Sequence, residues 1–374
     1  MSWSDIRGHA VQREMFRRAI RRGRLAHAYL FTGPEGIGKR QFALRLAQSL
    51  LCQRASEEAV EFCGECHACK MLAAGTHPDL LLVGRPEGKK ELTLEVFVGE
   101  RERRGREGLC YELYLRPVAS DRRIAIIDDT DLMNEESANA LLKTLEEPPE
   151  KSVLILLSEN PNALLPTIRS RCQLVRFFPL SRSDVAELLL EQDVVESREE
   201  AERIAALSGG SLAMAARLRD PRYRELFESL HRHLASEESR PLEAAAQINE
   251  QLDRLGGDAG QKRRNAHWVV AACVEFYRGA LRWLLVQREA GGDSSVEVRI
   301  DAAGPERAEV PETVRAFAAR FDPGSDDDLD WLIDFLERTM QAEDHLDRNV
   351  SVSFCVETLF ADLARISRKS PSAV

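Results

Sequence analysis

A glycine-rich loop that ends in a lysine is the feature of this sequence best suited to chemistry. It reads Gly33-Pro34-Glu35-Gly36-Ile37-Gly38-Lys39-Arg40, which is G-x-x-x-x-G-K followed by Arg instead of Ser or Thr. The backbone N–H groups and the lysine of such a loop hold nucleotide phosphates, while the Ser or Thr hydroxyl holds Mg²⁺. Arg40 cannot coordinate a cation. Gly33, Gly36, Gly38, Lys39 and Arg40 are therefore candidates for a degenerate site that takes ATP or ADP but has lost its metal ligand.

Two acids extend this candidate site. Asp128 and Asp129 follow the apolar run at 124–127. In phosphoryl-transfer sites an acid at the end of a buried strand holds Mg²⁺, and a following Glu would orient the attacking water. Asp129 is one methylene shorter than that Glu, which is a second departure from a hydrolysing site. The alternative is that both acids only end the strand.

Four of the eight cysteines lie close together, at Cys52, Cys63, Cys66 and Cys69. The spacing C-x10-C-x2-C-x2-C suits four thiolates around a tetrahedral Zn²⁺, a closed site that is structural and not catalytic. In a reducing compartment such a cluster indicates metal binding and not disulfides. An iron–sulfur cluster is the alternative, although no later Cys-Pro completes that pattern. His67 lies within the cluster and could compete as a ligand.

A third candidate is the arginine of the run Ser170-Arg171-Cys172, which lies just before an apolar segment. An arginine near the edge of a nucleotide-binding domain could reach the ATP of a neighbouring subunit as an arginine finger. The alternative is that Arg169 and Arg171 are simply solvated.

Composition limits the class of protein. The chain has 374 residues, enough for two or three domains, with 44% hydrophobic and 30% charged residues as in globular proteins. It has neither a long apolar run nor a signal-peptide core, so we expect a cytoplasmic protein with no membrane contact. The net charge of −10 argues against a chain that coats nucleic acid alone. A group of arginines near residues 13–24 faces either phosphates or solvent: Arg13, Arg17, Arg18, Arg21, Arg22 and Arg24.

Apolar periodicity predicts the elements that position these residues. Strands are expected at 28–31, 80–83, 124–127, 153–157 and 174–178, and helices at 9–22, 40–52 and 134–147. Val11, Met15, Phe16 and Ile20 are spaced for one helix face. Strands separated by helices imply a parallel, three-layer α/β domain. Within 85–120, an alternation from Leu92 to Val98 is typical of a strand and suggests a hairpin or an insertion.

After residue 179 the pattern contains helices only. Helices are expected at 182–192 and 199–207, and longer ones follow from about 221. A polar, glycine-rich break is expected near 291–310.

Taken together, these motifs resemble the clamp-loader subunits of bacterial DNA polymerase III, which belong to the AAA+ class. The resemblance rests on 27–31, the glycine loop, the cysteine cluster, 140–149 (Ala-Leu-Leu-Lys-Thr-Leu-Glu-Glu-Pro-Pro) and Ser170-Arg171-Cys172, and it covers 1–215 closely. It implies an AAA+ domain with a RecA-like parallel sheet at 1–179 with a zinc module at 52–69. It also implies a small helical lid at 180–220 and an all-α collar at 221–374 that joins five subunits, with 349–353 at the collar end.

Two types of subunit fit this resemblance. One is the ATP-hydrolysing gamma/tau motor, and the other is a stator-like subunit that does not hydrolyse ATP. Arg40, the acidic run at 128–131, the run at 75–79 and Ala213 in place of a sensor arginine favour the stator-like type. A weak motor of the gamma/tau type is the alternative, and a free zinc-binding DNA adaptor is disfavoured by the net charge.

The resemblance also implies roles and partners. Arg171 would be an arginine finger that acts in trans, and Ser158 and Asn160 would occupy the sensor position. The implied partners are gamma/tau and delta subunits in a heteropentameric ring. Through that ring the chain would meet the sliding clamp and primer-template DNA, in a replisome at the nucleoid.

Overall fold

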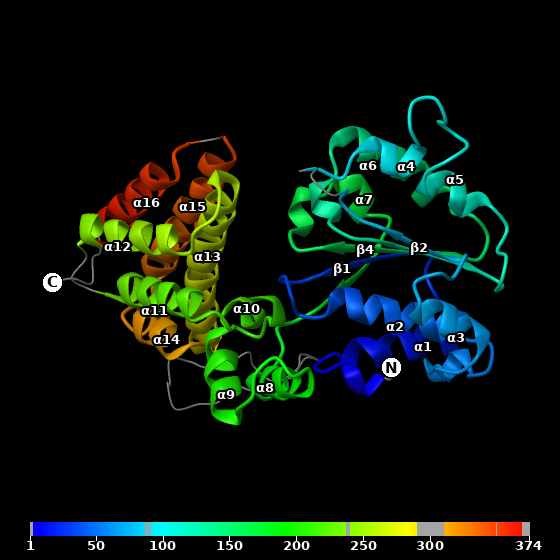
Figure 1. Cartoon of the computed structure of the whole chain (residues 1–374), viewed down its shortest axis with the longest axis horizontal. Helices are drawn as coiled ribbons and strands as arrows, with labels where there is room; N and C mark the ends of the chain where they lie inside the picture. The colour runs from blue at the N-terminus through cyan, green and yellow to red at the C-terminus, as the bar shows by residue number, and fades with distance from the viewer. Residues whose placement is uncertain are drawn as a thin grey trace. The chain divides into compact units, whose positions relative to one another are not determined.

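The structure, a computed structural model, describes residues 3–86, 89, 91–236, 240–289, 310–348 and 350–368. The chain divides into two compact units (Figure 1). The first comprises the residues up to Val185 together with Gly210–Ala213, and the second comprises Ala186–Gly209 and the described residues from Met214 onward. The predicted break near 291–310 lies outside the described residues except for its last position, and so does Asn349 of the predicted collar end.

A five-stranded parallel sheet forms the centre of the first unit. Its strands run in the order β2-β3-β4-β1-β5, and each neighbouring pair is parallel. The strands are β1 (Ala28–Thr32), β2 (Leu80–Val83), β3 (Arg123–Ile127), β4 (Ser152–Ser158) and β5 (Gln173–Arg176). Every residue of β1, β3 and β4 is buried, as expected for strands covered on both faces. The five predicted strands are confirmed, although the last ends before Phe177.

Helices cover both faces of this sheet (Figure 1). Alternate residues of β1 divide between two cores: Phe31 packs with Phe16 and Phe42, and Leu30 packs with Leu141 and Ile168 on the opposite face. One face carries α1 (Ala10–Arg21), α2 (Lys39–Leu51) and α3 (His67–Ala73), and the other carries α4 (Leu94–Val98), α5 (Leu109–Tyr114), α6 (Glu135–Glu146) and α7 (Pro166–Arg169). The three-layer α/β prediction is confirmed.

Short 3-10 helices complete the first unit. They are η1 (Trp3–Asp5), η2 (Glu57–Ala59), η3 (Thr130–Leu132) and η4 (Pro161–Ala163). Helix α1 confirms the helix expected near 9–22, but Val11 is 42% exposed, because the buried face centres on Gln12 and Phe16.

The strand expected between Leu92 and Val98 is wrong. The described residues there form helix α4, and only an isolated bridge joins Leu92 to Met133. Leu92, Phe97 and Leu113 are buried with side chains of β3 and α6, so the segment covers a face of the sheet instead of extending its edge. Apolar residues that face the same core from one helical turn and its flanking loop produced the apparent alternation.

The second unit is helical throughout its described residues. Its elements include α8 (Arg182–Glu191, which begins in the first unit), α9 (Arg198–Leu207), α10 (Leu212–Arg217, of which Leu212 and Ala213 belong to the first unit), α11 (Pro221–Ala235), α12 (Pro241–Arg254), α13 (Ala259–Glu289), α14 (Glu312–Ala318), α15 (Asp326–Asp347) and α16 (Val352–Ser367). An aromatic core holds these helices, in which Tyr277 of α13 stacks on Phe335 of α15 at 4.8 Å between ring centroids. The helices expected after residue 179 are confirmed, whereas the division at 179 and 220 stays a prediction.

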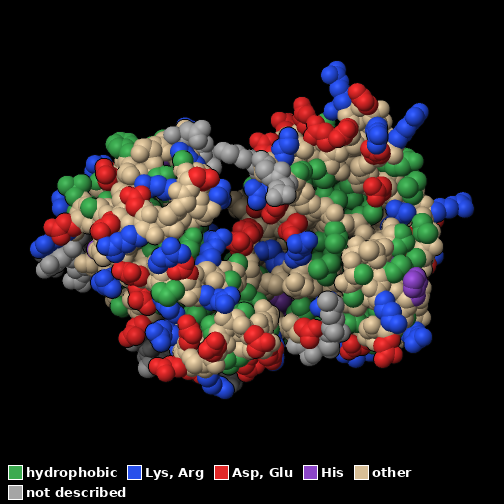
Figure 2. Space-filling model, viewed as in Figure 1, with side chains coloured by type: hydrophobic (Ala, Val, Ile, Leu, Met, Phe, Trp, Pro, Cys, Tyr) green, Lys and Arg blue, Asp and Glu red, His purple; other side chains and the backbone are tan. Residues whose placement is uncertain are grey.

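Figure 2 shows acidic and basic side chains interspersed over the face in view. Among the described helices, none is both long enough and apolar enough to span a bilayer.

Candidate functional site

The glycine loop lies between the end of β1 and the start of α2, as the sequence predicts. Gly36 has a φ of 73°, in the left-handed region that favours glycine. A Cβ atom at Gly36 would lie 2.5 Å from both the backbone N and the Cβ of Ala213, so this position has no room for a side chain. Gly38, with a φ of 96°, forms the N-cap of α2.

The lysine of the loop is held by the loop itself. Lys39 is 8% exposed, and its Nζ donates to the carbonyl oxygens of Gly33 and Pro34, each at 2.7 Å. Burial lowers the pKa of Lys39, although Glu159, Asp131 and Asp128 oppose this change. These two carbonyls hold the ammonium against the loop, the part of such motifs that cradles phosphates.

The residue that replaces the magnesium ligand pairs with the acid that would share that metal. Arg40 Nε lies 3.4 Å from Asp128 Oδ2, and Arg85 Nε lies 3.6 Å from Asp129 Oδ2. Burial, followed by the charge of Asp129, raises the pKa of Asp128, and Arg40 opposes this change. The structure therefore brings Lys39, Arg40 and Asp128 together, and it turns Asp129 towards Arg85.

A segment after helix α9 closes over the tip of the loop, which the sequence did not predict. The Ser211 hydroxyl donates to the carbonyl of Glu35 at 2.9 Å, and the N–H of Leu212 donates to the carbonyl of Gly36 at 2.9 Å. Ala213 contacts the position where Gly36 lacks a side chain. The identity of residue 36 as glycine was the one signal in the sequence, because a close approach of another backbone requires it.

The predicted sensor residues lie after β4. Ser158 is buried, and its hydroxyl has no partner among the described residues. The Asn160 side chain accepts from the N–H of Asn162 and so caps a short helix. Glu159 lies between these two residues in the chain. Its pKa is raised to about 7 by desolvation and by the carboxylates of Glu35, Asp131 and Asp129, while Lys39 opposes this change. Glu159 was not among the site residues predicted from the sequence.

The four cysteines form a compact cluster. Their Sγ atoms all lie within 4.8 Å of one another, and Cys52 Sγ lies 3.7 Å from Cys63 Sγ and 4.0 Å from Cys66 Sγ. Thiolates around a tetrahedral Zn²⁺ with Zn–S bonds of about 2.3 Å would lie about 3.8 Å apart. His67 begins α3 with an exposed side chain and is not part of the cluster. The cluster therefore suggests a structural zinc site.

Backbone N–H groups donate to three of these sulfurs, those of Cys52, Cys63 and Cys66. The N–H groups of Ala55 and Cys63 point at Cys52 Sγ, each at 3.4 Å, and those of Cys66 and Cys69 point at Cys63 and Cys66. Burial opposes ionisation of Cys52, but the backbone donors lower the pKa of Cys52 to about 6. Thiolates are the form in which cysteine binds metal.

Arg171 lies between α7 and β5, held at both ends of its guanidinium. Its Nη1 donates to the carbonyl of Thr167 at 2.9 Å, and its Nη2 lies 2.8 Å from Glu146 Oε1 at the end of α6. The side chain remains 36% exposed. Arg169, on the same turn, donates instead to Asn162.

The arginine-rich first helix is only partly neutralised. Arg13 pairs with Glu61, and Arg17 and Arg18 pair with Glu14. Arg21, Arg22 and Arg24 are exposed and have no partner in the part of the chain that the structure describes. Neither of the two interpretations of this helix, phosphate contact or a solvated face, is decided.

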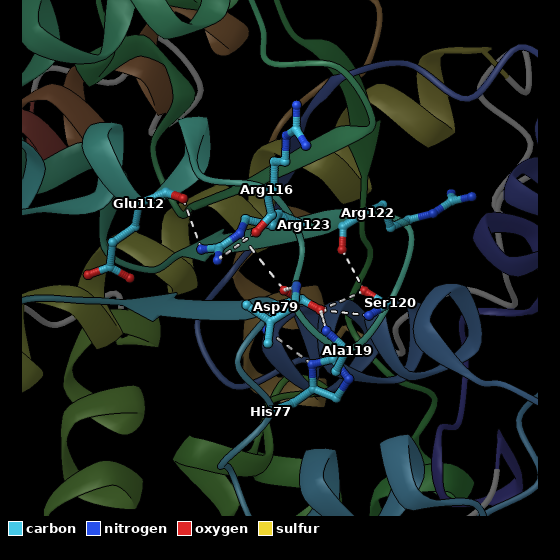
Figure 3. Close-up of polar contacts among 9 residues, drawn as sticks. His77, Asp79, Glu112, Arg116, Ala119, Ser120, Arg122 and Arg123 are labelled. Carbon is cyan, nitrogen blue, oxygen red and sulfur yellow. Dashed lines mark hydrogen bonds and ion pairs between the residues drawn. The ribbon is translucent and has the colours of Figure 1, made fainter.

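A buried acid anchors the segment between β2 and β3 (Figure 3). Asp79 is fully buried and accepts from the N–H groups of Val118, Ala119 and Ser120 at 2.7 to 2.8 Å. Arg123 Nε lies 3.8 Å from Asp79 Oδ1, and the same guanidinium donates to the carbonyls of Glu112 and Arg116. Burial opposes ionisation, yet these donors lower the pKa of Asp79. Asp79 lies within the run at 75–79 that the sequence pointed to, but this role was not predicted.

Comparison with known proteins finds similarity to subunits of DNA polymerase III. A family model described as "DNA polymerase III, delta subunit" matches residues 8–181. DNA polymerase III subunit delta' of Pseudomonas aeruginosa is 39% identical over 60% of this chain and 61% of the relative. Its Bacillus subtilis counterpart is 39% identical over 47% of this chain and 49% of the relative. The chain thus spans less than two thirds of the length of these relatives.

A tau/gamma subunit matches as well. DNA polymerase III subunit tau/gamma of Haemophilus influenzae is 29% identical over 59% of this chain and 30% of the relative. The two delta-prime relatives named above match at a higher identity than this tau/gamma relative. The matched part of the chain is therefore similar to delta and delta-prime subunits of DNA polymerase III.

Proposed function

We propose that the chain is a stator-like subunit of the DNA polymerase III clamp loader, the complex that places the sliding clamp on primed DNA. In this role it assembles with gamma/tau and delta subunits in a ring of five and donates Arg171 to the ATP of an adjacent motor subunit. The 39% identity to delta-prime proteins supports the assignment. The four cysteines would hold a structural zinc.

One observation carries the non-motor part of this proposal, the ion pair between Arg40 and Asp128. A hydrolysing site uses the residue after the lysine and the acid after the strand to hold Mg²⁺, which neutralises the charge that develops on the phosphates. Here a guanidinium occupies the first position and pairs with the second. The two groups that should share a cation neutralise each other instead.

The loop still supports binding of a nucleotide without turnover. Lys39 remains in place, and the two carbonyls it contacts are acceptors that a phosphate could replace. Ser211 and Leu212 bind the tip of the loop, so a nucleotide would have to fit beneath a loop that is already closed. We therefore propose static occupancy by ATP or ADP as the most that this site supports.

The proposed finger keeps the donors it needs. A guanidinium has five N–H groups. The Thr167 carbonyl accepts from one of them, and Glu146 forms an ion pair with Nη2. The N–H groups that remain and the partly exposed side chain leave Arg171 able to contact the phosphate of a neighbouring chain.

A weak motor of the gamma/tau type is the second candidate function, favoured by the 29% identity to the Haemophilus influenzae tau/gamma subunit. In that case Asp128 would release Arg40 and bind Mg²⁺ during turnover. The isolated full chain would then hydrolyse ATP in a manner that DNA stimulates.

The finger is tested by Arg171→Ala in the full chain reconstituted with gamma/tau and delta subunits. Because arginine fingers contribute about 10³-fold or more to the rate, the ATP site completed by this chain should become almost inactive. Turnover by the whole complex should fall to what its other sites supply. Arg169→Ala is the matched control, since Arg169 lies on the same turn but contacts Asn162.

Two results would contradict the proposal. Normal ATP turnover by an intact Arg171→Ala complex would exclude Arg171 as an arginine finger. Robust DNA-stimulated hydrolysis by the isolated wild-type chain would favour the motor instead. Ring assembly is checked by size-exclusion chromatography, so that lost activity is not confused with lost assembly.

A further inference from the structure

Glu146, the last residue of α6, lies against the proposed arginine finger. We propose that Glu146 is a positioning residue for Arg171: it holds the guanidinium in the orientation in which that group meets the phosphate of the neighbouring subunit. The inference rests on the proposed function of Arg171. Its basis is the 2.8 Å contact between Arg171 Nη2 and Glu146 Oε1.

Two acceptors fix the guanidinium from two directions. The carbonyl of Thr167, one turn earlier in the chain, accepts from Nη1, and a carboxylate oxygen of Glu146 forms an ion pair with Nη2. A single acceptor would leave the planar group free to rotate about the line joining donor and acceptor. Two acceptors on different nitrogens define the plane of the guanidinium.

The elements that carry these acceptors are themselves fixed. Leu141 and Leu145 of α6 and Ile168 of α7 are buried in the same core beneath the sheet. Pro148 and Pro149 follow α6 and prevent its extension, so that Glu146 stays at the end of the helix. The carboxylate is therefore presented from a rigid support, although its side chain is half exposed.

Fixing a long side chain in advance favours catalysis. An unrestrained arginine loses rotamer freedom when it contacts a phosphate, and this loss falls on the transition state if the contact forms there. Glu146 orders the side chain before the neighbouring nucleotide is engaged. Of the five N–H groups of Arg171, one donates to Thr167, so the ion pair with Glu146 does not exhaust its donors.

The test uses the full chain reconstituted with gamma/tau and delta subunits, with ATP as the probe. Glu146→Ala should lower kcat by about threefold or more while the KM for ATP stays unchanged, because the finger acts in the transition state. Glu146→Gln keeps an acceptor oxygen at the same place and should recover part of the loss. Glu147→Ala is the control, because it removes the same charge one residue further on, where no described residue pairs with that side chain.

A double variant separates this inference from the function on which it rests. In an Arg171→Ala background, Glu146→Ala should have no further effect on kcat, because Glu146 acts only through Arg171. If Arg171→Ala slows the complex and Glu146→Ala leaves kcat unchanged or raises it, Glu146 is not a positioning residue and the finger stands. If Arg171→Ala itself does not change kcat, both the arginine-finger assignment and the proposed role of Glu146 are wrong. Equal melting temperatures of the variants exclude a folding defect.

Discussion

The Nε atom of Arg40 lies 3.4 Å from Oδ2 of Asp128, so that the residue after the loop lysine is paired with the acid after β3. The two side chains are 60% and 33% exposed, and such a pair contributes at most about 1 kcal/mol to stability. Its importance is therefore geometric. Mg²⁺ would need a ligand at position 40 and the carboxylate of Asp128. Position 40 carries a guanidinium instead, and that guanidinium already pairs with Asp128.

Arg40→Thr should give this site a dependence on Mg²⁺ that the wild-type chain lacks. The substitution supplies a hydroxyl ligand and frees Asp128, which together form the usual magnesium shell. We expect Mg²⁺ to strengthen ATP binding by about tenfold or more in the variant, equivalent to about 1.4 kcal/mol, and to have little effect in the wild type. Isothermal titration calorimetry with and without Mg²⁺ measures the difference.

The control for Arg40→Thr is Arg85→Thr. Arg85 pairs with Asp129 and does not follow the loop lysine, so its loss should not create a magnesium shell. Wild-type binding that already depends on Mg²⁺ as strongly as that of Arg40→Thr would show that the ion pair does not exclude the metal.

The cysteine cluster should hold one zinc ion per chain. Removing one ligand, as in Cys63→Ser, should abolish stoichiometric zinc, because four thiolates close the tetrahedral shell. Elemental analysis of purified protein gives the metal content. Cys110→Ser should retain the zinc, since Cys110 lies outside the cluster and packs with α6 residues.

Colour would argue against zinc. An iron–sulfur cluster absorbs visible light, whereas a zinc–thiolate site does not. Iron in place of zinc in the wild-type chain would therefore assign the cluster to the alternative metal.

Asp79→Ala should be among the most destabilising substitutions in the first unit. It leaves Arg123 buried without its carboxylate and removes the acceptor for three N–H groups (Figure 3). Removing one partner of a buried pair costs about 3–5 kcal/mol. Chemical denaturation measures the loss, and hydrogen exchange at Val118, Ala119 and Ser120 localises it.

Asp121→Ala is the matched control for Asp79. Asp121 is exposed and lies 3.5 Å from Arg122, so its removal should change stability by no more than about 1 kcal/mol. Equal losses from the two substitutions would mean that the buried network does not anchor the segment.

His231 should make the second unit less stable in mild acid. It is buried, its ring lies 4.0 Å from that of Phe227, and burial lowers the pKa of His231 to about 4. Between about pH 6.5 and pH 4, His231 is protonated in the unfolded chain but stays neutral in the folded chain. The free energy of unfolding should therefore fall by about 3 kcal/mol as the pH drops through this window.

Denaturation of wild type and His231→Phe at several pH values checks this sign. The variant should lose this part of the pH dependence, whereas Thr313→Val should keep it. Thr313 is the hydrogen-bond partner of His231, but burial sets the direction of the pKa shift. Parallel curves for wild type and His231→Phe would exclude His231 as the titrating group.

Most elements of the fold could be predicted from local sequence patterns. The buried strands β1, β3 and β4 are apolar runs, and the helix after Asn134 begins where its side chain accepts from the N–H of Ser137. Such signals depend on neighbours in the chain, so they can be predicted from the sequence. The region from Leu92 to Val98 was predicted incorrectly because its alternation arises from burial against α6, which is not a neighbour in sequence.

The residue types of the candidate site also came from the sequence alone. The loop at Lys39, the acid at Asp128, the cysteine spacing and the run at Arg171 all lie where the sequence placed them relative to strands and helices. The sequence also identified Arg40 as unable to hold a cation. It did not indicate where the guanidinium would go.

Only the tertiary structure decided how these residues pair. The order β2-β3-β4-β1-β5 brings the loop after β1 near the acids after β3, although many residues separate them in the chain. The same packing joins Glu146 to Arg171, Gly36 to Ala213 and Asp79 to Val118. Each contact joins segments that are separate in the sequence. Apolar periodicity cannot predict such contacts, because ion pairs and hydrogen bonds depend on distances set by the whole fold. The sequence determined which groups this protein has, and the packing of its layers determined which of them meet.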